Sequence, residues 1–211
     1  MTAVPGITVD PRAFRPGDLA PALDVLRAGG VVAFPTDTFY GLAADPTHPE
    51  AVRQIFALKQ RPAGEALPLI AVSIEAVEQF CGPIGLVGGR LAGQFWPGPL
   101  ALLLDAPPTV DVGVHAGTGA VAIRVPDHPV ARALAGAFGR PLTATSANLS
   151  GRPPARHAAA LVELGGSVFV IDGGETAGGA PSTIVDARVS PPRLVREGAV
   201  PWKRVLTFLT P

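Results

Sequence analysis

The chain has 211 residues, 47% of them hydrophobic, which is enough for one sizeable core. Its 17 Lys and Arg residues balance its 17 Asp and Glu residues, so no overall positive field attracts nucleic acid or an anionic membrane. The single cysteine, Cys81, excludes a disulfide framework and a thiol-based zinc site. The start of the chain lacks the basic residues of a secretory signal, and no run of about 18 apolar residues follows. We therefore expect one domain over residues 1–211 and a cytoplasmic protein without a membrane partner.

Helical and β-type apolar patterns alternate along the chain. Residues 18–28 carry leucines at the spacing of one helix face and end at Gly29-Gly30, and a fully apolar strand follows at 31–34. The same criteria predict further strands at 69–72, 100–104, 121–125, 142–145, 168–171, 183–186 and 194–196. They predict further helices at 74–80, 86–95, 129–138 and 155–164. The alternation indicates an α/β fold, and the irregular segment 105–120 favours a twisted mixed β-sheet with helices packed on it over a purely parallel one.

The helix predicted after the first strand ends in two cations. Thr47 is expected to cap it, and its pattern stops at Lys59 and Arg61 because Pro62 cannot continue a helix. Lys59 is one of two lysines in a chain that otherwise uses arginine. A cation at a helix C-terminus is favoured by the helix dipole, which is the simpler interpretation. The alternative is that the ammonium and the forked guanidinium share one polyanion.

Two polar segments follow predicted strands. The first brings Thr36, Asp37 and Tyr40 to the end of the strand at 31–34, and the second brings Ser146 and Asn148 to the end of the strand at 142–145. Ligands of α/β sheets bind at the carboxyl ends of strands, so these hydroxyl and amide groups are candidates for holding a small ligand or phosphate oxygens. Plain turns, with Asp37 accepting from backbone N–H groups, are the alternative.

Two arginines, Arg124 and Arg196, lie at the ends of predicted strands. An unmatched buried charge costs several kcal/mol, so each should meet an anion or a carboxylate unless it lies on an exposed edge. The glycine-rich segment 173–179 is either a plain connection or a lid. The sequence contains no P-loop, no dinucleotide fingerprint and no nucleophile elbow, and its four histidines lack metal-ligand spacing.

Seven short segments in a fixed order resemble those of the threonylcarbamoyl-AMP synthase family, also called YrdC-like. They are Pro35-Thr36-Asp37-Thr38-Phe39-Tyr40-Gly41-Leu42, Lys59-Gln60-Arg61-Pro62, Pro68-Leu69-Ile70, Phe95-Trp96-Pro97-Gly98-Pro99-Leu100, Arg124-Val125-Pro126, Ser146-Ala147-Asn148-Leu149-Ser150-Gly151 and Ser182-Thr183-Ile184-Val185-Asp186. The segments lie between about residues 20 and 200, so the resemblance covers nearly the whole chain.

The resemblance implies an α/β domain with a large concave cationic cavity. The family converts L-threonine, bicarbonate and ATP into threonylcarbamoyl-adenylate and diphosphate, with Mg²⁺ expected on the ATP phosphates and no metal ligands from side chains. The resemblance places a catalytic tetrad around the nucleotide phosphates, joined there by Arg196: Lys59, Arg61, Ser146 and Asn148. It places the threonine at Thr36, Tyr40, Arg124 and Ser182. The implied downstream partners are tRNA threonylcarbamoyl-transferase proteins and, more weakly, tRNA itself.

This chain departs from the family pattern in two places. Many relatives have a histidine soon after the Pro-Leu-Ile segment, whereas this chain has Ala71-Val72-Ser73, so backbone or water is expected to replace one contact to the amino acid and strict threonine specificity stays open. The chain ends at Pro211 and is expected to lack the additional C-terminal domain of the longer family branch. Two alternative functions remain open: an RNA-binding module on the same concave surface, which the neutral net charge disfavours, and a related enzyme that activates another amino acid or carbamoyl substrate.

Overall fold

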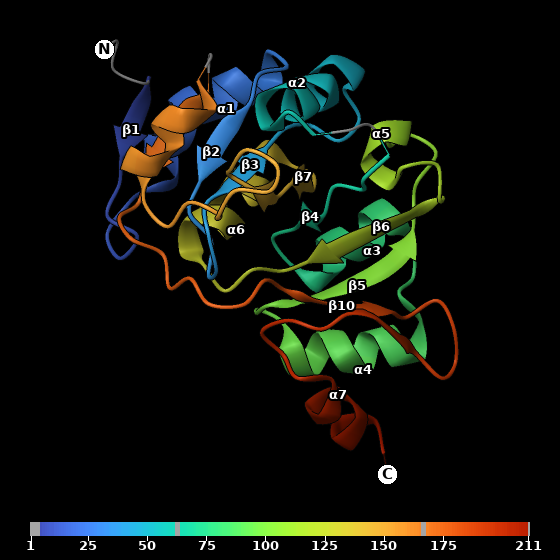
Figure 1. Cartoon of the computed structure of the whole chain (residues 1–211). Helices are drawn as coiled ribbons and strands as arrows, with labels where there is room; N and C mark the ends of the chain where they lie inside the picture. The colour runs from blue at the N-terminus through green and yellow to red at the C-terminus, as the bar shows by residue number, and fades with distance from the viewer. Residues whose placement is uncertain (1–4, 62–63, 166–167, 211) are drawn as a thin grey trace.

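Two mixed β-sheets, rather than the single sheet predicted from the sequence, form the framework of the protein in the computed structural model (Figure 1). The structure describes residues 5–61, 64–165 and 168–210. The first sheet contains, in spatial order, β1 (Gly6–Thr8), β9 (Phe169–Asp172), β2 (Val32–Phe34), β3 (Gly41–Ala43) and β8 (Thr145–Ser146). The second contains β11 (Arg193–Arg196), β10 (Thr183–Asp186), β5 (Leu100–Asp105), β6 (Ala120–Arg124), β4 (Leu69–Ile70) and β7 (Leu142–Thr143). Both sheets contain parallel and antiparallel pairs, as the sequence predicted.

The chain passes between the sheets at Ala144, which divides the single strand predicted at 142–145. β7 pairs with β4, whereas β8 pairs with β3. Between them, the Ala144 N–H donates to the carbonyl of Pro68 at 2.8 Å. The buried hydroxyl of Thr143 accepts from the Ala44 N–H at 2.8 Å and donates to the Leu42 carbonyl at 3.0 Å, so it also ties the two sheets together. The second polar segment of the sequence therefore begins where the sheets meet.

Seven α-helices and two 3₁₀ helices, η1 and η2, surround the sheets in the part of the chain that the structure describes. Their bounds are η1 (Pro16–Leu19), α1 (Ala20–Arg27), α2 (Pro49–Lys59), α3 (Ile74–Cys81), α4 (Gly85–Phe95), α5 (Val112–His115), α6 (Pro129–Phe138), η2 (Ala158–Leu164) and α7 (Trp202–Leu209). The segment predicted as a helix at 155–164 is η2, and β1, β3, α5 and α7 were not predicted. None of the helices described is long and apolar enough to span a bilayer.

The predicted cap of α2 is wrong. His48 is the N-cap, because its Nδ1 accepts a backbone N–H of the first turn at 3.2 Å. The Thr47 hydroxyl instead donates to Asp45 Oδ1 at 2.7 Å. The helix ends at Lys59 as predicted, since Gln60 takes a left-handed conformation with φ of 49°. Pro62, expected to end the pattern, lies outside the described residues.

The core explains why β2 is apolar on both faces. Val32 and Phe34 pack into a cluster with α1 and α6, while Ala33 packs into a second and larger cluster that includes residues of α2, β4, β5 and β6. A strand buried on both faces is a continuous apolar run instead of an alternating one. At the other end of the molecule α7 packs on α4, where the rings of Phe95 and Phe208 meet edge to face at 5.8 Å (Figure 1).

Candidate functional site

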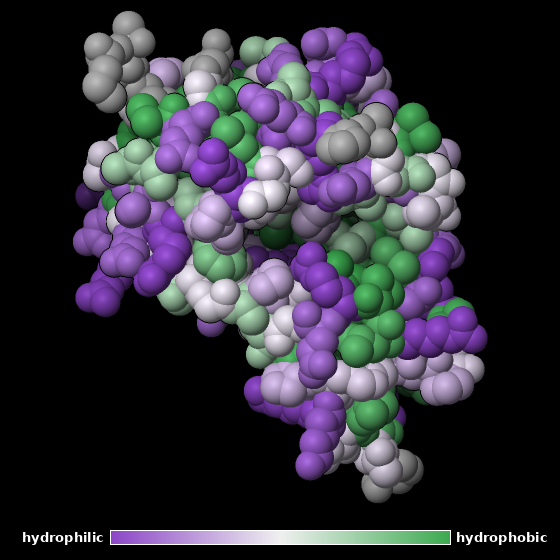
Figure 2. All heavy atoms as spheres, in the orientation of Figure 1, coloured by the Kyte–Doolittle hydropathy of each residue, from purple (hydrophilic) through white to green (hydrophobic). Residues whose placement is uncertain are grey.

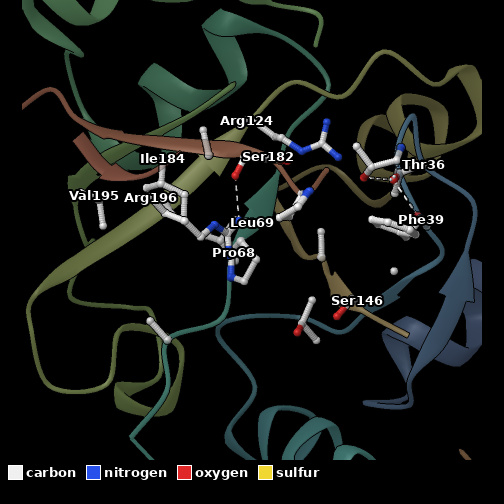
Figure 3. Close-up of a pocket in the computed structure, with 18 of the residues that line it drawn as sticks. Thr36, Phe39, Pro68, Leu69, Arg124, Ser146, Ser182, Ile184, Val195 and Arg196 are labelled. Atoms are coloured by element: carbon white, nitrogen blue, oxygen red, sulfur yellow. Dashed lines mark hydrogen bonds between the residues drawn. The ribbon is translucent and has the colours of Figure 1, made fainter. Parts of the chain in front are cut away.

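A cavity of about 290 Å³ opens where the two sheets meet (Figure 3). The space-filling view shows a recess near the middle of this face, surrounded by many hydrophilic residues (Figure 2). The loop between β2 and β3 lines one side of the cavity, and residues of β4, β5, β6, β8, β10 and β11 line the rest. Seven of the nine predicted site residues contribute to its wall: Thr36, Tyr40, Arg61, Arg124, Ser146, Ser182 and Arg196. A volume of this size is at the lower end of the range for small-molecule sites.

Lys59 lies beneath the cavity wall rather than in it. Its residue is only 2% exposed, and its Nζ donates to the carbonyl of Ser146, to the carbonyl of Asn148 at 3.0 Å and to Asn148 Oδ1 at 3.2 Å. Burial, reinforced by the positive charge of Arg61, lowers the pKa of Lys59 to about 8. The predicted convergence of Lys59 with the loop that carries Ser146 and Asn148 is thus found in the structure.

Arg61 and Arg196 bring two positive charges to the same cavity. Arg61 Nη1 donates to Thr145 Oγ1 at 3.3 Å. Its Nε forms an ion pair with Glu65, at 2.7 Å from a carboxylate oxygen. The Nε–H does not point at that oxygen, so this buried N–H makes no hydrogen bond among the described residues. Arg196 Nη2 donates to the Ser182 carbonyl at 2.8 Å (Figure 3). Partial burial and the charge of Arg61 lower the pKa of Arg196. Two like charges beside one cavity favour an anionic ligand.

Arg124 meets a carboxylate that the sequence did not assign to the site. Its Nη1 lies 2.7 and 2.8 Å from the two oxygens of Asp37 and 3.1 Å from the carbonyl of Gly98. The Arg124 side chain is 8% exposed and that of Asp37 is 11% exposed, so this is a buried ion pair. The expectation that Arg124 meets an anion or a carboxylate is confirmed, whereas Asp37 does not serve its own turn as a plain acceptor. The signal for this pair was two opposite charges near the ends of apolar strands, Arg124 as the last residue of β6 and Asp37 soon after β2.

The hydroxyls of Thr36 and Tyr40 are already engaged within the protein. Thr36 Oγ1 donates to the Phe39 carbonyl at 2.7 Å and accepts from a backbone N–H at 3.1 Å. The Tyr40 hydroxyl donates to the Gly174 carbonyl at 2.8 Å and accepts from the Gly173 N–H at 3.2 Å. Burial, together with the charge of Asp172, raises the pKa of Tyr40 to about 12. Tyr40 therefore ties the glycine-rich segment to the cavity wall.

Most of the remaining wall is apolar. Ile184 and Val195 lie at the side of the cavity away from Thr36 and Arg124 (Figure 3). Val195, on the edge strand β11, is 54% exposed. Within the residues that the structure describes, no three acidic, histidine or cysteine side chains gather as a metal site. The cavity thus combines an apolar surface with cations and hydroxyls, which suits a ligand with an apolar part and anionic groups.

Known proteins are similar to this chain in sequence and in fold. The Sua5/YciO/YrdC family model, described as telomere recombination, matches residues 24–198. A threonylcarbamoyl-AMP synthase of Pyrococcus abyssi is 39% identical over 186 residues, which cover 87% of this chain and 55% of that protein. One of Vibrio campbellii is 38% identical over 180 residues, which cover 83% of this chain and 96% of that protein. The chain therefore spans about half the length of the P. abyssi relative and nearly all of the Vibrio one.

Solved structures of two relatives have the same fold as this chain. The crystal structure of P. abyssi Sua5 complexed with L-threonine has a TM-score of 0.89 and 35% identity, covering 99% of this chain and 61% of that one. Escherichia coli YciO has a TM-score of 0.82 and 25% identity, covering 97% of this chain and all of that one. The α/β fold predicted from the sequence is confirmed, and the chain belongs to the Sua5/YciO/YrdC family.

Proposed function

We propose that the protein is a nucleotidyltransferase of the cytoplasm that forms L-threonylcarbamoyl-adenylate and diphosphate from L-threonine, bicarbonate and ATP. The names of its relatives support this activity, and one of them binds L-threonine in its crystal structure. The observation that carries the proposal is the cavity itself, in which Arg61 and Arg196 face a space that Arg124 also lines. The adenylate would pass to proteins that transfer the threonylcarbamoyl group to tRNA.

The reaction requires anions to approach one another. The threonine amine and bicarbonate form a carbamate with loss of water, and a carbamate oxygen then attacks the α-phosphorus while diphosphate leaves. Fixed cations lower the repulsion between carbamate and phosphate without any side-chain nucleophile. Arg61 and Arg196 would hold the phosphates on the side of the cavity that Ser146 also lines, with Lys59 and Asn148 of the predicted tetrad behind that wall. Mg²⁺ would spread the phosphate charge, held by the phosphates and water because the described wall offers no acidic cluster.

The amino acid would occupy the side of the cavity near Arg124. One nitrogen of Arg124, Nη1, makes all the hydrogen bonds to Asp37 and Gly98, and its Nη2 and Nε have no hydrogen-bond partner among the described residues. This edge of the guanidinium can bind a carboxylate. Thr36, Tyr40 and Ser182 complete this part of the wall. Where many relatives have a histidine this chain has Ala71-Val72-Ser73, so backbone groups and water are expected to replace that contact to the amino acid.

The direct test is release of diphosphate from ATP by the purified full chain, with threonine and bicarbonate each left out in turn. We expect release that requires both, and loss of at least about 10-fold in kcat/KM for Arg61→Met, because one hydrogen bond from a charged group is worth about 1.5–3 kcal/mol. Lys203→Met, an exposed site on α7, is the matched control. No release from the unmodified chain, or equal release without threonine, would overturn the proposal. A panel of other amino acids distinguishes a relative with a different substrate.

A further inference from the structure

Two members of the predicted phosphate-binding tetrad do not line the cavity. We infer that Lys59 and Asn148 are positioning residues, which form a clamp that holds the loop of residues 146–150 so that Ser146 lines the cavity. Arg61 is then the member of the tetrad that offers N–H groups to phosphate at the cavity, because the Ser146 hydroxyl donates its one proton to Asn148 Oδ1. The consequence for ATP binding rests on the proposed function, but the clamp itself exists, and can be measured, without any substrate.

The ammonium of Lys59 is fully used by the loop. An ammonium has three N–H donors, and Lys59 Nζ has three acceptors: the Ser146 carbonyl, the Asn148 carbonyl and Asn148 Oδ1. The residue is almost completely buried, so water does not replace any of these oxygens. A phosphate could bind this ammonium only by breaking one of the three bonds, which would release part of the loop. The geometry therefore assigns Lys59 to the loop.

The side-chain amide of Asn148 is equally occupied. Its Oδ1 accepts from Lys59 and from the Ser146 hydroxyl at 2.6 Å. Its Nδ2 donates to the Leu149 carbonyl at 2.8 Å and to the Arg152 carbonyl at 2.6 Å. Both lone pairs and both donors of the amide are thus used within the protein, by Lys59 and by the turn itself. Asn148 connects the ammonium of Lys59 to the far end of the turn.

Main-chain bonds hold the two sides of the loop. The Ser150 N–H donates to the Lys59 carbonyl at 2.8 Å, so one residue binds the loop through both its side chain and its backbone. On the other side, the Ala147 N–H donates to the Tyr40 carbonyl at 2.8 Å, beside the pairing of Ser146 with Gly41 in β3. Hydrogen bonds thus hold one side of the loop to the end of α2 and the other side to the first sheet. A site held in this way before binding loses little conformational entropy when the ligand arrives.

Amide hydrogen exchange of the ligand-free full chain tests the clamp. Lys59→Met removes the ammonium and keeps an unbranched side chain, and Asn148→Ala removes the amide while the Lys59 ammonium keeps the two backbone carbonyls as acceptors. Both variants should speed exchange of the Ala147 and Ser150 amides by at least about 10-fold while exchange in β5 and β6 is unchanged, which marks a local opening. Arg61→Met, at the cavity, is the matched control and should alter these amides by less than about 2-fold.

Two results would overturn the inference. One is unchanged exchange of the loop in Asn148→Ala, which also covers the case in which Lys59→Met fails to fold. The other is an equal effect of Arg61→Met on the loop. Because no substrate is present, neither result bears on whether the protein makes an adenylate. If both proposals hold, the clamp variants raise the KM for ATP in proportion to the loop opening, while the threonine KM stays within about 2-fold.

Discussion

Removing the carboxylate of Asp37 should strongly destabilise the protein, because it leaves Arg124 as an unpaired buried cation. The two side chains are 11% and 8% exposed, and both carboxylate oxygens lie within 2.8 Å of Arg124 Nη1. Breaking a buried pair by removing one partner costs about 3–5 kcal/mol. In a chain of this size each kcal/mol lowers the melting temperature by about 2–4 °C, so Asp37→Asn should lower it by roughly 6–20 °C. The Gly98 carbonyl at 3.1 Å stays as an acceptor, which favours the lower half of that range.

A double-mutant cycle separates the ion pair from other effects of the substitution. Arg124→Met alone leaves the Asp37 carboxylate without its cation, whereas the double variant leaves no buried charge and should cost less than the sum of the two single variants. Glu50→Gln is the control, because it breaks the pair between Glu50 and Arg53 on the surface, where the side chains are 56% and 67% exposed. Such exposed pairs contribute about 0–1 kcal/mol.

Thermal and denaturant unfolding followed by circular dichroism supply the free energies for the cycle. The reasoning fails if Asp37→Asn costs no more than Glu50→Gln, or if the double variant costs the full sum of the two single ones. Either result would mean that solvent reaches Arg124 well enough to replace its partner. A cost confined to threonine binding, with stability unchanged, would have the same meaning.

Three further predictions follow from groups that are single or nearly single in this chain. Burial raises the pKa of Tyr40, the only tyrosine, to about 12, so an absorbance titration of the native protein should show tyrosinate near pH 12 against about 10 when unfolded; a native midpoint near 10 contradicts this. Burial and Arg61 lower the pKa of Lys59 to about 8 from 10.5. Between about pH 8 and 10.5 the Lys59 side chain is protonated in the unfolded chain and neutral in the native one. The unfolding free energy of the unmodified chain, relative to that of Lys59→Met, should therefore rise with pH over this range. If the difference between the two does not change with pH, the lowered pKa of Lys59 is refuted. Burial raises the pKa of Cys81, the lone cysteine, to about 12, so an aromatic disulfide reagent at pH 8 should label the native chain at least about 100-fold more slowly than the unfolded chain; equal rates would contradict it.

Local sequence predicted the elements that have a clear apolar pattern. The strand at 31–34 is β2 with one residue fewer, and 129–138 is α6 without change, because a doubly buried strand and a one-faced helix have distinct apolar patterns. β3 was missed since Gly41–Ala43 is short and directly follows a polar turn. The division of 142–145 was missed because it depends on bonds from Ala144 to residues distant in the sequence.

The site was predictable to the extent that it depends on strand ends. Seven predicted residues reach one cavity because the loops after several strands meet at the junction of the two sheets. The sequence could not show which groups face the cavity. Lys59 lies under the loop because the backbone carbonyls of residues 146 and 148 turn toward it, and backbone direction is not encoded by residue type. The roles of the predicted site residues in binding nucleotide and threonine stay predictions.

A chain with no net charge can still have a positive potential at one cavity, because the arginines that line it differ in how closely a carboxylate neutralises them. Arg124 has its carboxylate within the buried wall, and Arg61 has Glu65 on its outer side, whereas Arg196 meets only a carbonyl among the described residues. The side chains of Arg124 and Arg61 are only 8% and 17% exposed, so their charges act through a medium of lower dielectric and are less screened by salt than cations spread over a surface. Arg196, by contrast, is an exposed residue of β11. An RNA backbone needs the second arrangement, with many exposed cations that release counterions. A compact polyphosphate needs the first, so the distribution of charge, which the net value of zero conceals, favours a nucleotide over a polynucleotide as the ligand of this cavity.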